Sequence, residues 1–249
     1  MNSRYFTAGF WLTSVAVVAA LFLSGCGVAL GGPGKDPEAV PPEGVLDFTT
    51  LFNQNCAGCH GAEGNGAAAI TLHNPVYLAI ASDDVIRQVS SRGVPGTPMT
   101  PFAQSAGGQL TDKQIDVIVS GIRSWARPDQ FTGVSLPPYK ADTPGNPQGG
   151  AAVYVTFCAS CHGANGEGSP KASAIVDGSY LALVSDQNLR TIVIAGWPSI
   201  HAPDWRNDLP GNPLSPQQIS DVVAWLVAQR PQFPGQPYPS RPENSESLR

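Results

Sequence analysis

Apolar residues recur at helical spacing in two segments of the chain, residues 110–122 and 214–226. In both segments the apolar side chains follow at i, i+3, i+4 and i+7, which places them on one face of a helix. These positions are Ile115, Ile118, Val119, Ile122 and Ile219, Val222, Val223, Leu226. The pattern predicts two amphipathic helices, each with one buried face.

Each of these segments begins with a helix-start signal. A Ser or Thr followed three residues later by Gln predicts a capping box, and the pairs are Thr111 with Gln114 and Ser215 with Gln218. A shorter helical pattern lies upstream in each half of the chain, at Phe48, Leu51, Phe52 and at Val153, Tyr154, Phe157. Two similar sets of short helices are therefore expected.

The repetition extends to the sequence itself. The stretch CAGCHGAEGNG, residues 56–66, recurs as CASCHGANGEG, residues 158–168, which is 102 positions later. The stretch YLAIASDDVIRQV, residues 77–89, recurs as YLALVSDQNLRTI, residues 180–192, which is 103 positions later. The fold class predicted from these repeats is all-α, with two tandem small domains joined by a Pro/Gly-rich linker.

Composition supports this division. Gly and Pro, with 27 and 24 residues, make up about a fifth of the chain and are dense between the repeats. The predicted segments are a signal peptide 1–25, a tether 26–46, a first domain 47–127, a linker 128–148, a second domain 149–230 and a Pro-rich tail 231–249. The net charge of −5 gives no basic face for nucleic acid.

The N-terminus has the pattern of an export signal. Arg4 precedes an apolar run over residues 10–23, which is short for a membrane-spanning helix. The following LSGC, residues 23–26, resembles a bacterial lipobox, which implies cleavage before Cys26 and lipidation of that residue. An uncleaved anchor is the alternative. Both interpretations place the chain outside the cytoplasm, and the first predicts a lipid-anchored protein on the periplasmic face of a bacterial membrane.

The remaining four cysteines all belong to two Cys-x-x-Cys-His motifs. They are Cys56, Cys59, Cys158 and Cys161, followed by His60 and His162. This is the attachment signature of c-type haem, in which two thiols form thioethers with the porphyrin and the His binds iron. A CxxC disulfide is an alternative, but that motif is typical of a βαβ context. A zinc site would need ligands from both repeats across the linker.

With these motifs the chain resembles the diheme class I cytochromes c, as a membrane-anchored bacterial lipoprotein of that kind. The resemblance implies a compact helical fold around each of two covalently bound haem c groups, and electron transfer as the activity. In that family the distal iron ligand is a Met in a Pro-rich loop, and Met99 matches. In that family a proline carbonyl accepts a hydrogen bond from the proximal His and orients it. The resemblance gives this role to Pro75, and Gly178 takes its place in the second repeat.

The second repeat has no methionine, since the chain contains only Met1 and Met99. Thirty-nine positions separate His60 from Met99, and thirty-nine also separate His162 from His201. His201 is therefore the predicted distal ligand of the second iron, with a loop His and an open iron as the alternative. A Met ligand raises the haem potential relative to a second imidazole, so we expect two unequal haems. His73 has no counterpart and is expected to be solvated.

The leading functional hypothesis is a carrier or relay of single electrons between a membrane redox complex and a terminal acceptor. That acceptor would be an oxidase, a reductase or a photosynthetic reaction centre, and no small-molecule substrate is expected. The alternative is a diheme enzyme with an open haem, such as a cytochrome c peroxidase or a sulfur-compound dehydrogenase. A gas-binding module is a third class. Binding of carbon monoxide by the native ferrous protein would separate these classes.

Overall fold

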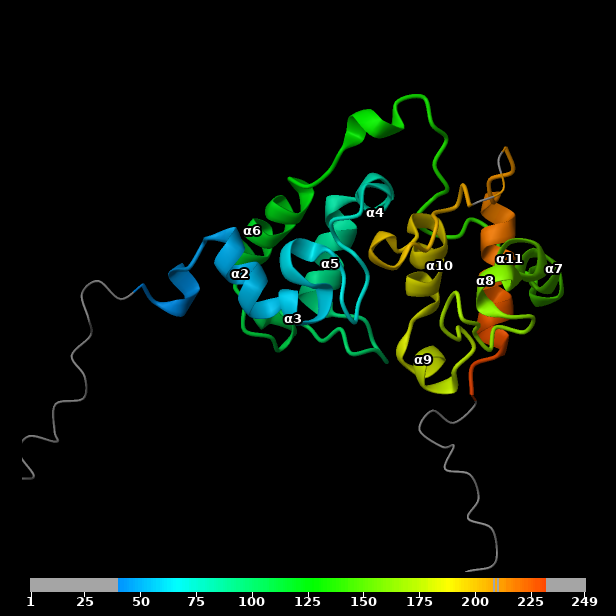
Figure 1. Ribbon diagram of the computed structural model, residues 1–249. Helices are drawn as coiled ribbons and strands as arrows, with labels where there is room; N and C mark the ends of the chain where they lie inside the picture. The colour runs from blue at the N-terminus through cyan, green and yellow to red at the C-terminus, as the bar shows by residue number, and fades with distance from the viewer. Residues whose placement is uncertain (1–39, 208, 210, 232–249) are drawn as a thin grey trace, which may run out of the picture. The chain divides into compact units, whose positions relative to one another are not determined.

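The computed structural model describes residues 40–207, 209 and 211–231 (Figure 1). These residues form helices, turns and loops, with two isolated β-bridges and no strand among them. The predicted all-α fold is confirmed. The signal peptide, Cys26 and residues 232–249 of the tail lie outside the described residues. Within the described ranges, no helix has the length and apolarity needed to cross a membrane.

Among the described residues the α-helices recur in the same order, whereas the 3-10 helices between them do not correspond. The first repeat contains α2 (Phe48–Asn55), α3 (Ala57–His60), η2 (Ala62–Gly64), α4 (Pro75–Ile80), α5 (Asp83–Arg92), η3 (Gln104–Ala106) and α6 (Asp112–Arg123). The second contains α7 (Pro147–Phe157), α8 (Ala159–His162), α9 (Gly178–Leu183), α10 (Asp186–Ala195), η5 (Pro198–Ile200) and α11 (Pro216–Ala228). Two short turns, η1 (Pro42–Gly44) and η4 (Pro128–Phe131), lie outside this repeated pattern.

The capping boxes predicted for the last helix of each repeat are present. In α6 the Gln114 amide nitrogen of the backbone donates to the Thr111 hydroxyl, and the Gln114 side chain accepts from the Thr111 backbone. Ser215 and Gln218 make the same two bonds at α11. The apolar faces of both helices are buried, as their spacing predicts.

The first helix of the second repeat begins inside the predicted linker. Asn146 is its N-cap, and its side chain accepts from the backbone N–H groups of Gln148 and Gly149. Pro147 follows at the first helical position, where its missing N–H and fixed φ favour helix formation. The helix α7 therefore starts two residues before the sequence boundary at residue 149.

The first and last helices of each repeat cross at a glycine, but the glycine lies on opposite helices. In the first repeat, Gly121 of α6 lies against the ring of Phe48 in α2. In the second, Gly150 of α7 lies against α11, and a β-carbon there would come 2.7 Å from Cβ of Trp225. Helices approach closely where a side chain is missing, so each crossing pairs one glycine with one large aromatic residue.

An arginine at the end of each repeat ties the helices together. Arg123 donates to the carbonyl oxygens of Leu78 and Ala81, which end α4, and pairs with Asp83 at the start of α5. Arg230 makes the matching bonds to Leu181, Val184 and Asp186. Each arginine satisfies carbonyls that the end of a short helix leaves unpaired. The sequence analysis did not single out either residue.

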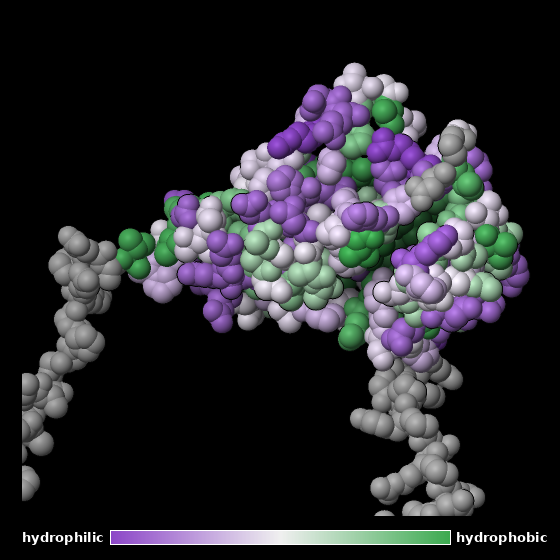
Figure 2. All heavy atoms as spheres, viewed as in Figure 1, coloured by the Kyte–Doolittle hydropathy of each residue, from purple (hydrophilic) through white to green (hydrophobic). Residues whose placement is uncertain are grey.

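Both repeats belong to one compact unit, Val45–Arg249. The amide of Asn74, buried in the first repeat, donates to the carbonyl of Ala195 in the second at 2.8 Å. The linker is held on α10 by Arg190, which is 3% exposed and donates to the carbonyls of Pro138 and Tyr139. The surface mixes polar and apolar residues across the face seen in Figure 2.

Candidate functional sites at the two Cys-x-x-Cys-His motifs

The two cysteines of each motif lie on one helical turn. Cys56 precedes the four-residue helix α3, and its carbonyl accepts from the backbone N–H groups of Cys59 and His60 at 3.2 and 3.0 Å. Cys158 precedes α8, and its carbonyl accepts from Cys161 and His162 at 3.1 and 3.0 Å. This turn directs both thiols of a pair to one side, as attachment of a single porphyrin at two points requires.

None of these four cysteines forms a disulfide, and the surroundings of two of them favour a neutral group. Burial, with a smaller contribution from Cys59, raises the pKa of Cys56 to about 12. Burial and Cys161 raise the pKa of Cys158 to about 11. Zinc-binding and redox-active thiols need the opposite shift, toward the thiolate. A thioether is neutral and apolar, so it suits these positions.

The alternatives of a disulfide exchanger and a zinc site find no support in the described part of the chain. The βαβ context of a redox CxxC is missing there, because those residues form no strand. The described residues also contain no group of three or more His, Cys, Asp or Glu side chains that could hold a metal ion.

Each proximal histidine is oriented by a backbone carbonyl. The Nδ1 atom of His60 lies 2.9 Å from the carbonyl oxygen of Ile70, and Nδ1 of His162 lies 2.8 Å from that of Ser173. A carbonyl oxygen can only accept, so each Nδ1 carries the proton and each Nε2 keeps a free lone pair, as the predicted role of iron ligand requires. This arrangement makes an imidazole a better ligand.

The predicted role of Pro75 is wrong, because the carbonyl that contacts Nδ1 of His60 is that of Ile70. Pro75 is the first residue of α4, behind the N-cap Asn74, and a residue there directs its carbonyl along the helix. The loop after His60 folds back sooner than the sequence pattern suggested. Ser173 occupies the place equivalent to Ile70, which supplies the acceptor for His162 that the sequence left unidentified.

Glycines make this early return of the loop possible. The N–H of Gly66 donates to the carbonyl of His60 at 2.7 Å, and Gly168 does the same to His162 at 2.8 Å. Both glycines have φ near +90°, at 88° and 92°, a conformation that side chains with a β-carbon rarely adopt. The bond returns the chain beside its own motif and brings the acceptor carbonyl to the imidazole.

The two proximal histidines differ in burial. His60 is 8% exposed, and burial lowers its pKa, which favours the neutral imidazole. His162 is more exposed than His60. His73, which was expected to be solvated, is half-buried, and its ring stacks on Trp125 with centroids 4.9 Å apart and the planes inclined by 11°. It is part of the aromatic packing of the first repeat.

The two predicted distal ligands lie in loops closed by equivalent hydrogen bonds. In the first repeat the N–H of Val94 donates to the carbonyl of Met99 at 2.8 Å. In the second the N–H of Trp197 donates to the carbonyl of Ala202 at 2.9 Å. Each loop follows a glycine with φ near +65°, Gly93 or Gly196. The backbone therefore pairs Met99 with Ala202 and leaves His201 one position earlier.

The offset between the repeats explains this difference. The haem motifs are 102 positions apart, whereas the segments from Tyr77 and Tyr180 onward are 103 apart, because the second repeat has one extra residue between them. The equal 39-position spacing that singled out His201 makes no allowance for that extra residue, which lies between His162 and His201. Binding of the second iron by His201 stays a prediction from the sequence.

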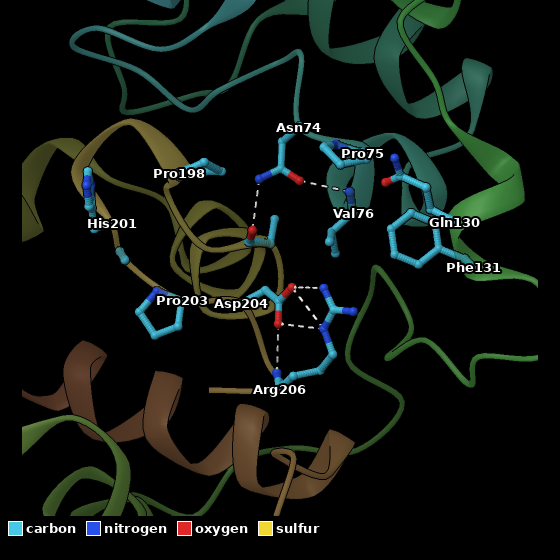
Figure 3. A pocket seen from close by; sticks show the side chains of 12 residues that line it. Asn74, Pro75, Val76, Gln130, Phe131, Pro198, His201, Pro203, Asp204 and Arg206 are labelled. Carbon is cyan, nitrogen blue, oxygen red and sulfur yellow. Dashed lines mark hydrogen bonds and ion pairs between the residues drawn. The ribbon is translucent and has the colours of Figure 1, made fainter. Parts of the chain in front are cut away.

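A cavity of about 400 Å³ lies beside the distal loop of the second repeat (Figure 3). His201 lies at its rim, with the imidazole away from the cavity centre. Asp204 and Arg206 face the cavity and pair with each other at 2.5 Å. The cavity also contacts Asn74 and Phe131 of the first repeat and the linker.

This fold and these two motifs define a c-type cytochrome with two attachment sites. The Cytochrome c family profile matches residues 49–125 and 148–229. The chain belongs to the cytochrome c family, and it carries two covalently bound haem c groups. The fit rests on the paired thiols of each turn and on the Nδ1 bonds that direct each Nε2.

Several curated proteins are similar to this chain. The cbb3-type cytochrome c oxidase subunit CcoP of Azospirillum sp. (strain B510) is 36% identical over 140 residues, which cover 52% of this chain and 42% of that protein. The cytochrome bc1 complex cytochrome c subunit of Mycobacterium bovis is 28% identical over 193 residues, 74% of this chain and 64% of that protein. The chain thus spans less than half of CcoP.

Solved structures offer a weaker likeness. The Kuenenia stuttgartiensis reducing HAO-like protein complex Kustc0457/Kustc0458 is 18% identical, with a TM-score of 0.43, over 78% of this chain and 99% of that chain. A likeness of this size carries no functional conclusion.

Proposed function

We propose that this diheme cytochrome carries single electrons between a membrane respiratory complex and a terminal acceptor. The observation that carries the proposal is the duplicated turn in which two thiols and an oriented imidazole serve one haem. A bound haem supplies a one-electron couple, and the protein holds it covalently and sets its ligands. The similar proteins named as subunits of oxidase and bc1 complexes support a respiratory partner.

We further propose Met99 as the distal ligand of the first iron. Its loop is Pro-rich, and two hydrogen bonds fix the backbone of Met99. Its carbonyl accepts from Val94, and its N–H donates to the hydroxyl of Thr97 at 3.2 Å. A thioether ligand raises the potential of its haem, and the second repeat has no methionine to match it. The first haem is then the higher-potential site, whether or not His201 binds the second iron.

The burial of the proximal histidines supports the same order. A buried site disfavours the extra positive charge of the ferric state, and His60 is more buried than His162. Electrons would pass from the second repeat to the first. The net charge of −5 favours a partner with a basic docking surface.

The place of action is also a proposal. The LSGC stretch that ends at Cys26 supports lipid attachment on the periplasmic face of a bacterial membrane. A lipoprotein cysteine with more than one acyl chain holds a protein at the membrane stably. Such an anchor would keep the cytochrome beside its membrane donor.

The experiment is purification of the tagged full-length protein from native membranes in mild detergent, followed by identification of partners. A respiratory complex should co-purify, and its substrate should reduce both haems within the assay. A Cys26→Ala variant serves as the control for membrane attachment. Isolation without a redox partner, together with haems that no membrane donor reduces, would contradict the proposed function.

A further inference from the structure

The distal loops of the two repeats differ at the position that faces iron in the family. Hydrogen bonds from Val94 to Met99 and from Trp197 to Ala202 close the two loops in the same register. A methionine in the first loop is thus matched by an alanine in the second. The alanine side chain lacks the three terminal heavy atoms of methionine, including the sulfur ligand.

His201 is poorly placed to supply the missing ligand. It has φ 60° and ψ 23°, the left-handed conformation that is disfavoured for residues with a β-carbon. Its side chain is exposed, and Figure 3 shows the imidazole at the cavity rim. In the register of the loop hydrogen bonds, Ala202 and not His201 occupies the place of Met99.

The charged side chains described near this loop are already paired or lie elsewhere. The Asp204 carboxylate accepts from the Arg206 guanidinium in a two-pronged ion pair, and Arg206 also lies over the Trp205 ring. Lys171 lies between Cys161 and Ser173, in the loop that serves the proximal histidine. None of these side chains stands at the loop position that matches Met99.

The buried residues around the loop determine which kind of ligand this place would favour. Trp205 is 4% exposed, and Ile194, which precedes the loop, is fully buried. Leu181 and Leu189 belong to a separate buried apolar cluster of the second repeat. An apolar surrounding disfavours charged ligands, and the three missing atoms leave room for a molecule of two or three atoms.

We propose that the second haem site, and not the first, binds a small neutral diatomic molecule at its distal position beside Ala202. The inference rests on the proposed ligation of the first iron by Met99. It gives the chain a ligand-binding site in addition to its electron-transfer role.

The test uses the full-length holoprotein, reduced without air and titrated with carbon monoxide. Absorption spectra give the stoichiometry, and the infrared C–O stretch reports the surroundings of the bound molecule. The wild type should bind one carbon monoxide per two haems without denaturation. No binding, or binding at both haems, would overturn the proposal.

Matched variants at the equivalent positions identify the site. Ala202→Met should abolish binding, and Met99→Ala should raise the stoichiometry from one to two. His201→Ala should leave the stoichiometry at one. If the wild type binds nothing and His201→Ala binds one, His201 is a firm iron ligand and the proposal fails. Electron transfer from the membrane partner is measured separately, so the failure of one proposal does not imply failure of the other.

Discussion

Gly150 of α7 lies against Trp225 of α11, and this contact fixes how closely the two helices of the second repeat approach. A β-carbon at Gly150 would collide with the backbone of Asp221 and come 2.7 Å from Cβ of Trp225. In the first repeat the corresponding close approach of two helices is between Phe48 and Gly121. The two crossings are equivalent in place but opposite in which helix carries the glycine.

Replacement of this glycine should destabilise the protein. We expect Gly150→Ala to lower the free energy of unfolding of the holoprotein by about 1–3 kcal/mol, because backbone atoms of α11 cannot move aside without separating the helices. Urea unfolding followed by far-UV circular dichroism measures the loss.

The neighbouring glycine provides the control. At Gly149 a β-carbon would meet only the end of the flexible Asp221 side chain, at 3.3 Å. Gly149→Ala in the same helix should be neutral or stabilise by up to about 1 kcal/mol. Equal losses in the two variants would mean that helix approach is not the cause.

The arginine at the end of the second repeat should contribute strongly to stability. Arg230→Ala leaves the carbonyls of Leu181 and Val184 without their donor and is expected to cost about 1–3 kcal/mol. Arg230→Lys should not restore the loss, since one ammonium cannot reach several acceptors at once.

Denaturant unfolding of both variants tests this expectation. Arg87→Ala, which removes an exposed surface pair with Asp116, is the comparison and should cost about 0–1 kcal/mol. If Arg230→Ala is no worse than Arg87→Ala, the bonds to the helix end add nothing measurable.

The two haems should titrate at different potentials. Met99→Ala should lower the potential of the first haem, because the sulfur ligand that favours Fe(II) is lost. The same variant should abolish the sulfur-to-iron band at the red end of the ferric spectrum. Spectroelectrochemical titration measures both effects, and a band that survives in Met99→Ala would refute the ligand assignment.

The mature chain is expected to begin at a lipid-modified Cys26. Mass spectrometry of the membrane-extracted protein should show the loss of residues 1–25 and the added mass of acyl chains. Cys26→Ala should keep the signal segment or release the protein from the membrane. An unmodified Cys26 in the wild type would rule out the lipoprotein assignment.

The sequence by itself determined the features that depend on local spacing. Cys-x-x-Cys-His places two thiols and an imidazole on one turn, so the pattern alone predicts haem attachment at both motifs. The capping boxes at Thr111 and Ser215 involve only four consecutive residues, so they could also be predicted from the sequence. The repeat of these signals established two similar helical units.

Tertiary structure decided the features that depend on how loops return. The carbonyl that orients His60 comes from Ile70 and not Pro75, because the Gly66 bond to His60 folds the loop back early. Ala202 stands in the place of Met99, because one extra residue shifts the register before the distal loop. Equal spacing along the chain therefore does not identify equivalent positions in the two repeats. The hydrogen bonds that close each loop show which positions correspond.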